Sequence, residues 1–241
     1  MRSPSDEQQR LMDLQDHDLH LARLDHQAKT LPVLKELAHA TEGYESHVAL
    51  AIASETERSD IEIELNRSAS DVEQVDMRLA KDQQLIDSGH ASAKDLQNLL
   101  SELESLRKRK EELEEVELEI MVRIDDALSR RKHHESERDR FKGEVERLTS
   151  ERDVALAKIT SERDQVSSER EAIATTIAKE LIDLYNKVKE SNGGIGAARL
   201  KDGKCDGCHL TINTVELGRI KSLPDDEVVR CEECHRILVR V

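Results

Sequence analysis

Every cysteine in this sequence belongs to one of two Cys-x-x-Cys pairs in the last part of the chain. Cys205 and Cys208 form the first pair, and Cys231 and Cys234 form the second after 22 intervening residues. Each pair can fold into a tight turn that aims two thiolates at one point, so together they can complete a tetrahedral four-sulfur site. Four thiolates leave no position for water or substrate, so the spacing predicts a zinc ribbon with one structural Zn2+.

The alternatives to structural zinc are iron in the four-cysteine site and a redox role for the thiols. A redox Cys-x-x-Cys pair would need a thioredoxin-like βαβ context, which the sequence lacks. His209 and His235 each follow the second cysteine of a pair. Because four thiolates already saturate a tetrahedral ion, we expect both imidazoles outside the ligand shell.

The rest of the chain is too poor in large apolar side chains for an ordinary globular core. Its 241 residues include one Phe, two Tyr and no Trp, while 37% are charged. This composition is typical of long helices that pair through narrow apolar seams. The formal net charge of -15 argues against a nonspecific nucleic-acid binder, because an acidic surface repels phosphate.

The sequence also bears on the compartment. No apolar run approaches the ~20 residues needed to cross a membrane, and the segment Met1 to Arg10 lacks the apolar core of a signal peptide. Cysteines gathered at metal-binding spacing fit a reducing compartment better than a disulfide framework. We therefore predict a cytoplasmic protein without a membrane partner.

A first long helix is predicted from about residue 6 to about residue 87, because apolar residues recur at three-, four- and seven-residue steps. Pro32 cannot donate an interior backbone hydrogen bond, so we expect a kink or a brief break near residue 32. A turn is predicted over residues 88–92, where Gly89 is a strong breaker. Ser92 and Asp95 then resemble the capping box that opens a helix.

A second helix is predicted from about residue 93 to about residue 190. Its apolar seam keeps one heptad register, with Leu103, Leu113, Ile120, Ala127, Phe141, Leu148, Ile159, Val166 and Ile173 among its members and His134 among the polar exceptions. Two helical stretches of comparable length joined by a short turn favour an antiparallel hairpin, with position i opposite roughly 180 minus i. The alternative is a parallel dimer of two long helices.

The predicted fold is therefore mainly α, with a coiled-coil hairpin over residues 1–190 and a small zinc ribbon over residues 191–241. Consecutive glycines after Asn192 end the second helix. Apolar or β-branched runs at 210–212 and 237–241 predict short strands, and 214–222 a helical turn or two. The second helix outlasts the first, and its last apolar stripe is expected to pack against the N-terminal segment or the ribbon. This stripe consists of Ile177, Leu181, Leu184 and Val188.

Basic residues suggest a nucleic-acid interface. The candidates are Arg130, Arg131, Lys132 and Arg138 on the second helix and Arg219, Lys221 and Arg236 in the ribbon. Charge runs on coiled coils are usually solvated faces, however, and the ribbon's basic residues are balanced by acidic ones. The ribbon has no aromatic residue on which a base could stack, which disfavours single-strand recognition.

No pattern in the sequence points to an enzyme. It has no phosphate-cradling glycine loop and no nucleophile elbow. The histidines of the first helix are expected on solvated surfaces, without a pocket. They are His17, His20, His26, His39 and His47.

The whole chain resembles the bacterial C4-type zinc-ribbon family, in which a long coiled-coil hairpin precedes a four-cysteine ribbon. Three segments carry the resemblance: Ala93 to Leu99 with Leu103 and Glu104 beyond it, Lys204 to Cys208, and Cys231 to Val239. The resemblance implies Cys205, Cys208, Cys231 and Cys234 as the zinc ligands. Where the family usually has glycine after the fourth cysteine, this chain has His235.

Members of that family are linked to flagellar or secretion-related regulation as chaperone-like protein binders, and to RNA binding. The resemblance therefore implies an adaptor. Our first hypothesis is a non-enzymatic adaptor that uses the stalk as a spacer and engages a protein partner through the ribbon and the end of the second helix. The alternative is a nucleic-acid-binding regulatory protein that uses the ribbon and the basic patch on the second helix. We expect a monomer or a weak homo-oligomer.

Overall fold

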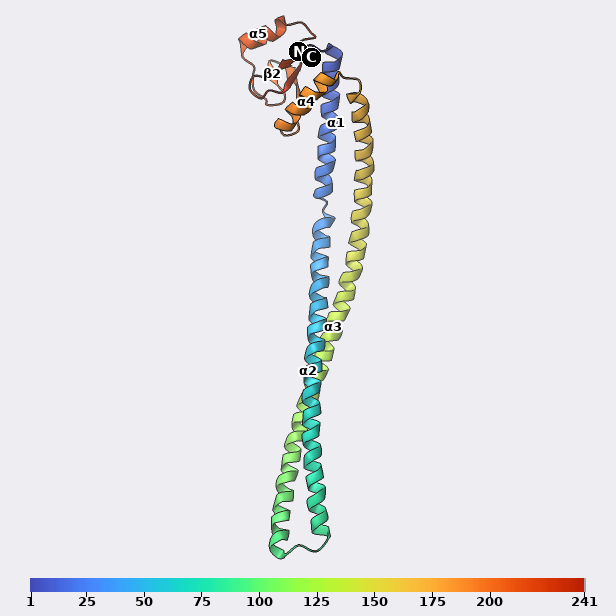
Figure 1. Cartoon of the computed structure of the whole chain (residues 1–241), viewed down its shortest axis with the longest axis vertical. Helices are drawn as coiled ribbons and strands as arrows, with labels where there is room; N and C mark the ends of the chain where they lie inside the picture. The colour runs from blue at the N-terminus through green and yellow to red at the C-terminus, as the bar shows by residue number, and fades with distance from the viewer. Residues whose placement is uncertain (241) are drawn as a thin grey trace. The chain divides into compact units, whose positions relative to one another are not determined.

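The computed structural model describes residues 1–240 and confirms a mainly α fold with a helical hairpin followed by a small β region (Figure 1). Its elements are α1 (Ser5–Lys29), α2 (Val33–Asp87), α3 (Ala93–Ala174), α4 (Lys179–Ser191), β1 (Ala197–Lys201), β2 (Lys204–Cys205), α5 (Thr214–Ser222), β3 (Val229–Arg230) and β4 (Ile237–Arg240). The strand expected at 237–241 is present as β4, and Val241 lies outside the described residues. The run at 210–212 forms only an isolated bridge between Thr211 and Lys204.

The break expected near residue 32 is present between α1 and α2. The Thr30 hydroxyl donates a 2.9 Å hydrogen bond to the carbonyl of His26, and the Thr30 amide also bonds to that carbonyl. Pro32 then prevents the helical hydrogen-bond ladder from continuing, because it has no backbone N–H. The chain becomes helical again at Val33.

The expectation of one continuous second helix to about residue 190 is wrong. The helix α3 ends at Ala174, and the separate helix α4 begins at Lys179. The hydroxyls of Thr175 and Thr176 donate 2.7 Å hydrogen bonds to the carbonyls of Ala172 and Ile173. These local bonds and the β-branched side chains favour the end of a helix.

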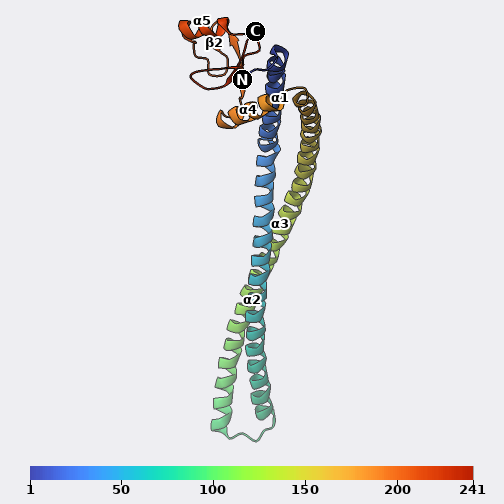
Figure 2. The ribbon, with the colours of Figure 1, turned by 45° about the horizontal axis from the view of Figure 1, so that its top comes forward.

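The N-terminus of α4 is capped by a side chain from another helix, α1. No side chain of its own caps α4, but Glu7 of α1 accepts a 3.2 Å hydrogen bond from the backbone N–H of Ala178. A carboxylate at this position also interacts favourably with the positive end of the helix dipole. Figure 2 shows α4 lying beside α1.

Contacts group the chain into two compact units, one formed by Met1–Leu34 with the chain from Thr149 onward, the other by Lys35–Leu148. The division into domains at residues 190 and 191 stays a prediction. In the first unit, α1 runs antiparallel to the end of α3. Asp18 pairs with Arg170 and Asp25 with Arg163. Leu24, Ile159 and Val166 form the apolar seam between them.

The second unit pairs α2 with the first part of α3, side by side in Figure 1. Asp76 accepts hydrogen bonds from Lys110, and Glu64 accepts one from Arg123. The predicted pairing of position i with roughly 180 minus i therefore places the partners on α3 slightly too early in the chain. The expected capping box is present at Ser92, whose hydroxyl accepts a 3.2 Å hydrogen bond from the Asp95 amide. Within this unit, the buried apolar side chains of α3 belong to the predicted seam, namely Leu103, Leu113, Ile120, Ala127 and Leu148. The buried apolar side chains of α2 in the same unit are Ala40, Ala51 and Ile61.

The ribbon contains a four-stranded sheet in the order β2-β1-β4-β3. β1 pairs with β4 in parallel, with Ala197 opposite Ile237, and the other two pairs are antiparallel. Because successive side chains of a strand point to opposite faces, β4 contributes to two cores. Ile237 and Val239 pack with α1 and α4, whereas Leu238 packs with the cysteines.

Candidate metal centre

The four cysteine thiols converge on one point. The Sγ atoms of Cys205 and Cys234 are 3.8 Å apart, those of Cys208 and Cys231 are 3.9 Å apart, and all four lie within 4.8 Å of one another. Four sulfurs at ~2.3 Å from a tetrahedral zinc ion would be separated by about 3.8 Å. The geometry therefore fits one Zn2+, which would act in folding because all four positions are filled by protein.

Each Cys-x-x-Cys pair is closed by backbone hydrogen bonds around its first cysteine. The amides of Gly207 and Cys208 bond to the Cys205 thiol, and the amides of Glu233 and Cys234 bond to the Cys231 thiol. Such bonds stabilise the thiolate form that metal coordination requires. The two halves of the site are thus built in the same way.

The residue after each pair adopts a left-handed backbone conformation. His209 has φ 60° and His235 has φ 58°. Their amides donate hydrogen bonds of 2.7 and 2.9 Å to the carbonyls of Cys205 and Cys231. The second knuckle therefore closes without the glycine usual in the family, with histidine in a conformation that glycine adopts more readily. Both imidazoles are exposed, and the metal-binding group found among residues 1–240 consists of the four cysteines.

The thiols differ in how readily they lose a proton. Burial raises the pKa of Cys205 to about 12 and also raises the pKa of Cys231. Burial acts on Cys234 in the same direction, but hydrogen bonds with Arg236, Cys231 and Cys208 together outweigh it and lower the pKa to about 7. Zinc must therefore displace protons from buried thiols, which makes its uptake dependent on pH.

A buried polar network, which the sequence did not predict, joins the ribbon to α1 and α4. The Tyr185 hydroxyl donates a 2.7 Å hydrogen bond to Asp18 and lies 3.2 Å from Oε1 of Gln15. Asp18 also forms ion pairs with Arg170 and Lys189. Burial, with the Asp18 carboxylate beside it, raises the pKa of Tyr185, so the phenol remains a donor. The sequence offered one sign of this network. Tyr185, one of only two tyrosines in the chain, falls on the apolar stripe of α4, where a hydroxyl needs a buried partner.

Gln15 fixes the segment that enters the ribbon. Its Nε2 donates a 2.9 Å hydrogen bond to the carbonyl of Gly194, and its Oε1 accepts bonds from the amides of Gly196 and Ala197. A Cβ on Gly196 would lie 2.7 Å from the Tyr185 ring, so the close approach requires glycine. The ribbon is therefore held to α1 by hydrogen bonds as well as by apolar packing.

The N-terminal residues also contact the ribbon. The Ser3 amide donates a 2.8 Å hydrogen bond to the carbonyl of Asp226, and the Val228 amide donates one of 3.0 Å to the carbonyl of Met1. Gln8 adds a bond from its side chain to the carbonyl of Asp225. Segments from the two ends of the described chain thus form one folded unit.

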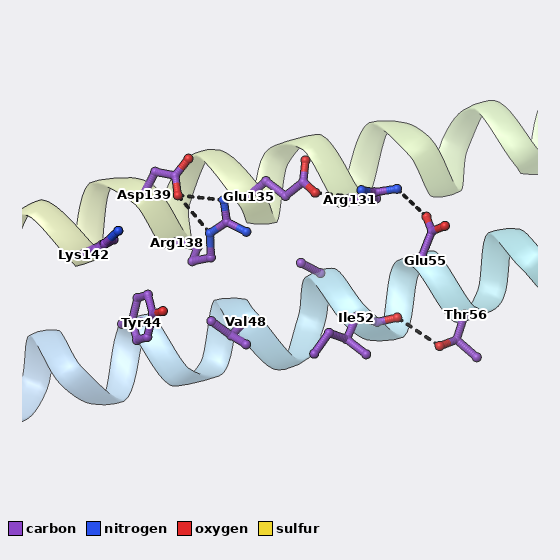
Figure 3. Close-up of a pocket in the computed structure, with 11 residues that line it drawn as sticks. Tyr44, Val48, Ile52, Glu55, Thr56, Arg131, Glu135, Arg138, Asp139 and Lys142 are labelled. Atoms are coloured by element: carbon purple, nitrogen blue, oxygen red, sulfur yellow. Dashed lines mark hydrogen bonds and ion pairs between the residues drawn. The ribbon is translucent and has the colours of Figure 1, made fainter.

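The basic residues of α3 have acidic partners across the helix pair. Arg130 donates a 2.6 Å hydrogen bond to Glu57. Arg131 donates one of 2.6 Å to Glu55, as Figure 3 shows. Arg138 pairs with its neighbour Asp139. Sequence reasoning missed the two cross-helix pairs, because Glu55 and Glu57 are distant in the chain.

Two of the three basic candidates in the ribbon, Arg219 and Arg236, also form hydrogen bonds within the protein. Arg219 forms a bidentate pair with Glu216, at 2.5 and 2.6 Å. Arg236 donates hydrogen bonds to the carbonyls of Ile195 and Asn192 and packs against Gly207. Lys132 and Lys221 are exposed. A nucleic-acid interface made from these residues stays a prediction.

Three of the five histidines expected on solvated surfaces are half-buried instead, namely His17, His20 and His47. Nδ1 of His47 lies 3.2 Å from Nδ1 of His134, on the opposite helix of the Lys35–Leu148 unit. The signal was present in the sequence, because His134 falls on the seam register and the hairpin places residue 47 near it. His17 and His20 lie beside the exposed carboxylates of Glu169 and Glu162.

Comparisons with known proteins agree with this architecture. Residues 14–193 match the family described as CT398-like coiled coil hairpin domain, and residues 204–238 match a C4-type zinc ribbon domain. Rv2229c of Mycobacterium tuberculosis is 32% identical over 245 residues, which covers 100% of this chain and 98% of that protein. Among residues 1–240, no helix combines the length and apolar character needed to cross a membrane.

Solved structures show the same fold. A Mycobacterium smegmatis structure matches with a TM-score of 0.87 and 30% identity, over 100% of both chains. CT398 from Chlamydia trachomatis matches with a TM-score of 0.78 and 17% identity, over 98% of both chains. Together with the four converging thiols, these matches show that the chain belongs to the bacterial family in which a CT398-like coiled-coil hairpin carries a C4-type zinc ribbon with one structural zinc ion.

Proposed function

We propose that the protein is a non-enzymatic cytosolic adaptor in which the helical hairpin presents the zinc ribbon to a protein partner. The observation that carries this proposal is the pair of apolar side chains that the ribbon exposes. Val215 at the start of α5 is 82% exposed, and Leu210 is 51% exposed. Both side chains are free for a partner to cover, and apolar contacts of this kind contribute to binding where they gather into one patch.

The closed metal site supports a binding role over catalysis. Four thiolates around one ion leave no coordination position for substrate. The network of Gln15, Asp18 and Tyr185 fixes how the ribbon sits on α1 and α4. A binding surface that is already ordered loses less conformational entropy when it meets its partner.

The end of the second helical stretch does not belong to this surface. Its stripe packs against the N-terminal segment and the ribbon, as the sequence predicted, and is not left uncovered. Leu181 is 0% exposed and Val188 is 2% exposed. The proposed contact surface is therefore restricted to the exposed side of the ribbon around Leu210 and Val215.

The test compares three zinc-loaded, full-length proteins as bait in a cell lysate. These are the unchanged protein, the double variant Leu210→Glu with Val215→Glu, and the control Val154→Glu. Val154 is similarly exposed at 55% but lies on α3. We expect the same set of captured proteins with the unchanged bait and the control, and loss of that set with the double variant. Zinc content and melting temperature should be equal in all three.

Equal capture by the double variant would contradict the proposed surface. A parallel salt-dependent titration with RNA and duplex DNA tests the alternative function. Tight binding at physiological salt that is lost with Arg130→Ala, Arg131→Ala and Lys132→Ala combined would favour nucleic-acid recognition instead.

A further inference from the structure

A cluster of aromatic and imidazole rings joins α2 to α3 within the Lys35–Leu148 unit. His47 and His134 face each other with their Nδ1 atoms 3.2 Å apart and their ring centroids 5.4 Å apart. His133 lies on the outer side, with its centroid 5.4 Å from that of His134. Neither the zinc ribbon nor the proposed contact surface uses this cluster.

The 3.2 Å separation of the two nitrogens allows a hydrogen bond between the imidazoles, and it is also that of two ligands on one metal ion. Imidazole nitrogens lie ~2.0–2.1 Å from zinc, so two of them at a tetrahedral angle are about 3.3 Å apart. We propose that His47 and His134 form a second metal site, in which their Nδ1 atoms chelate a divalent transition-metal ion that favours imidazole, such as Ni2+, Cu2+ or Zn2+. The remaining coordination positions would be open to water, unlike those of the four-cysteine site.

Neighbouring side chains hold the His47 ring in place. It stacks on Phe141, with the centroids 5.6 Å apart and the planes at 22°. Phe141 in turn lies against Gly43, where a Cβ would come within 2.5 Å of the ring. Arg140 covers Phe141, with its guanidinium carbon 4.2 Å from the centroid. Outer residues that fix a ligand ring in this way lower the cost of ordering it around a metal.

The charges around the pair favour the neutral imidazoles that metal binding needs. Partial burial and the neighbouring His133, His47 and Arg130 lower the pKa of His134. Arg130 is neutralised in part by Glu57, and Arg140 by Glu137. The Glu137 carboxylate, which is paired with Arg140, also interacts with His47 and His133.

The test is a calorimetric titration of the zinc-loaded full-length protein with Ni2+ at pH 7.5. We expect one further ion per chain. Affinity should fall by about tenfold or more in His47→Gln and in His134→Gln, because each removes one of two ligands. His39→Gln is the matched control, since His39 is exposed on the same helix α2. It should bind Ni2+ like the unchanged protein.

A direct readout on the unchanged protein guards against variants that fold poorly. Paramagnetic Ni2+ should broaden the NMR signals of the His47 and His134 imidazoles before those of His17 and His20. The proposal is overturned if no ion binds beyond the ribbon zinc, or if both glutamine variants bind as tightly as the control. Release of zinc with a new thiolate–nickel absorption band would also overturn it, because the added ion would then occupy the cysteines.

Discussion

The Tyr185 hydroxyl donates a 2.7 Å hydrogen bond to Asp18, a contact between α4 and α1 across 167 positions of sequence. Asp18 also receives Arg170 at 2.7 Å and Lys189 at 3.0 Å. Helices from three places in the chain therefore meet at one carboxylate. Because Tyr185 also packs against Gly196, this meeting point determines where the ribbon begins.

Replacing Tyr185 by phenylalanine keeps the packing and removes the donor. We expect Tyr185→Phe to lower the free energy of unfolding by about 1–3 kcal/mol, because the buried Asp18 carboxylate loses a hydrogen-bond donor. Urea unfolding of the zinc-loaded protein measures the change. Tyr44→Phe, on the half-buried second tyrosine in α2, should change stability by less than about 0.5 kcal/mol. Equal losses of unfolding free energy in Tyr185→Phe and Tyr44→Phe would contradict a stabilising hydrogen bond from the Tyr185 hydroxyl.

Two glycines within helices should respond to alanine in opposite directions. Alanine is favoured over glycine by about 1 kcal/mol in a helix interior. Gly143→Ala on α3 meets nothing within 4 Å and should stabilise the protein by about that amount. Gly43→Ala on α2 would place a Cβ 2.5 Å from the Phe141 ring and should destabilise it instead.

Thermal unfolding measures both glycine variants. Combining Gly43→Ala with Phe141→Leu should restore part of the loss, because the smaller side chain relieves the overlap. If the double variant is less stable than the two single changes together predict, the clash with Phe141 is not the cause.

The third prediction concerns His235, whose backbone adopts the left-handed conformation. A residue with a Cβ pays about 1–2 kcal/mol in this conformation, whereas glycine adopts it readily. His235→Gly should therefore stabilise the zinc-loaded ribbon by about 1 kcal/mol relative to His235→Ala. Amide hydrogen exchange of β4 is the measurement. Both variants should retain one zinc ion, because the imidazole lies outside the ligand shell.

Removal of zinc should unfold the ribbon while leaving the coiled coil of the Lys35–Leu148 unit folded. The cysteines form the centre of the core that contains Ala198, Ile220 and Leu238, and zinc sites of this kind contribute ~10–16 kcal/mol in isolated fingers. After chelation, the amides of Ala198 and Leu238 should lose their protection from exchange. Amides of the Lys35–Leu148 unit should keep theirs. A ribbon that stays protected without metal would contradict a structural role for zinc.

The ion pairs of Glu55 predict a pH effect within the Lys35–Leu148 unit. A hydrogen bond from Arg58, aided by one from Arg131, lowers the pKa of Glu55 to about 2. A carboxylate whose folded pKa is depressed contributes stability above its unfolded pKa, near 4.3, and that contribution is lost as the pH falls through about 2. An NMR titration of the Glu55 carboxyl carbon should show this midpoint. Arg131→Ala should move the midpoint upward, and an ordinary midpoint in the unchanged protein would refute the prediction.

Cysteine spacing and the apolar seam allowed the ribbon, its ligands and the helical hairpin to be predicted from sequence. Both are local patterns whose meaning depends on few other residues. The end of α3 was missed because its apolar stripe continues unchanged through Ile177 into Leu181, so periodicity alone could not distinguish one helix from two. What ends the helix is the competition of the Thr175 and Thr176 hydroxyls for backbone carbonyls, together with Glu7 from α1.

Contacts between distant segments explain the other misses. Arg131 pairs with Glu135 four residues on, but its second partner, Glu55, became visible only once the two helices were paired. The same pairing brings His47 to His134. Polar side chains in a seam carry no periodic signal of their own, so sequence places them but does not identify their partners.

The strand β4 lies between β1 and β3, so the order in which the chain is synthesised matters. Leu11 and Leu14, made near the start, are covered by Ile237 and Val239, made near the end. The pairing of Met1 with Glu227 spans 226 positions. At ribosomal speeds of about 5–20 residues per second, Leu11 and Leu14 of α1 wait roughly 10–45 s for their contacts with β4 in each round of translation. Nascent-chain chaperones that recognise exposed leucines therefore have a defined interval in which to bind α1 before zinc and β4 close the unit.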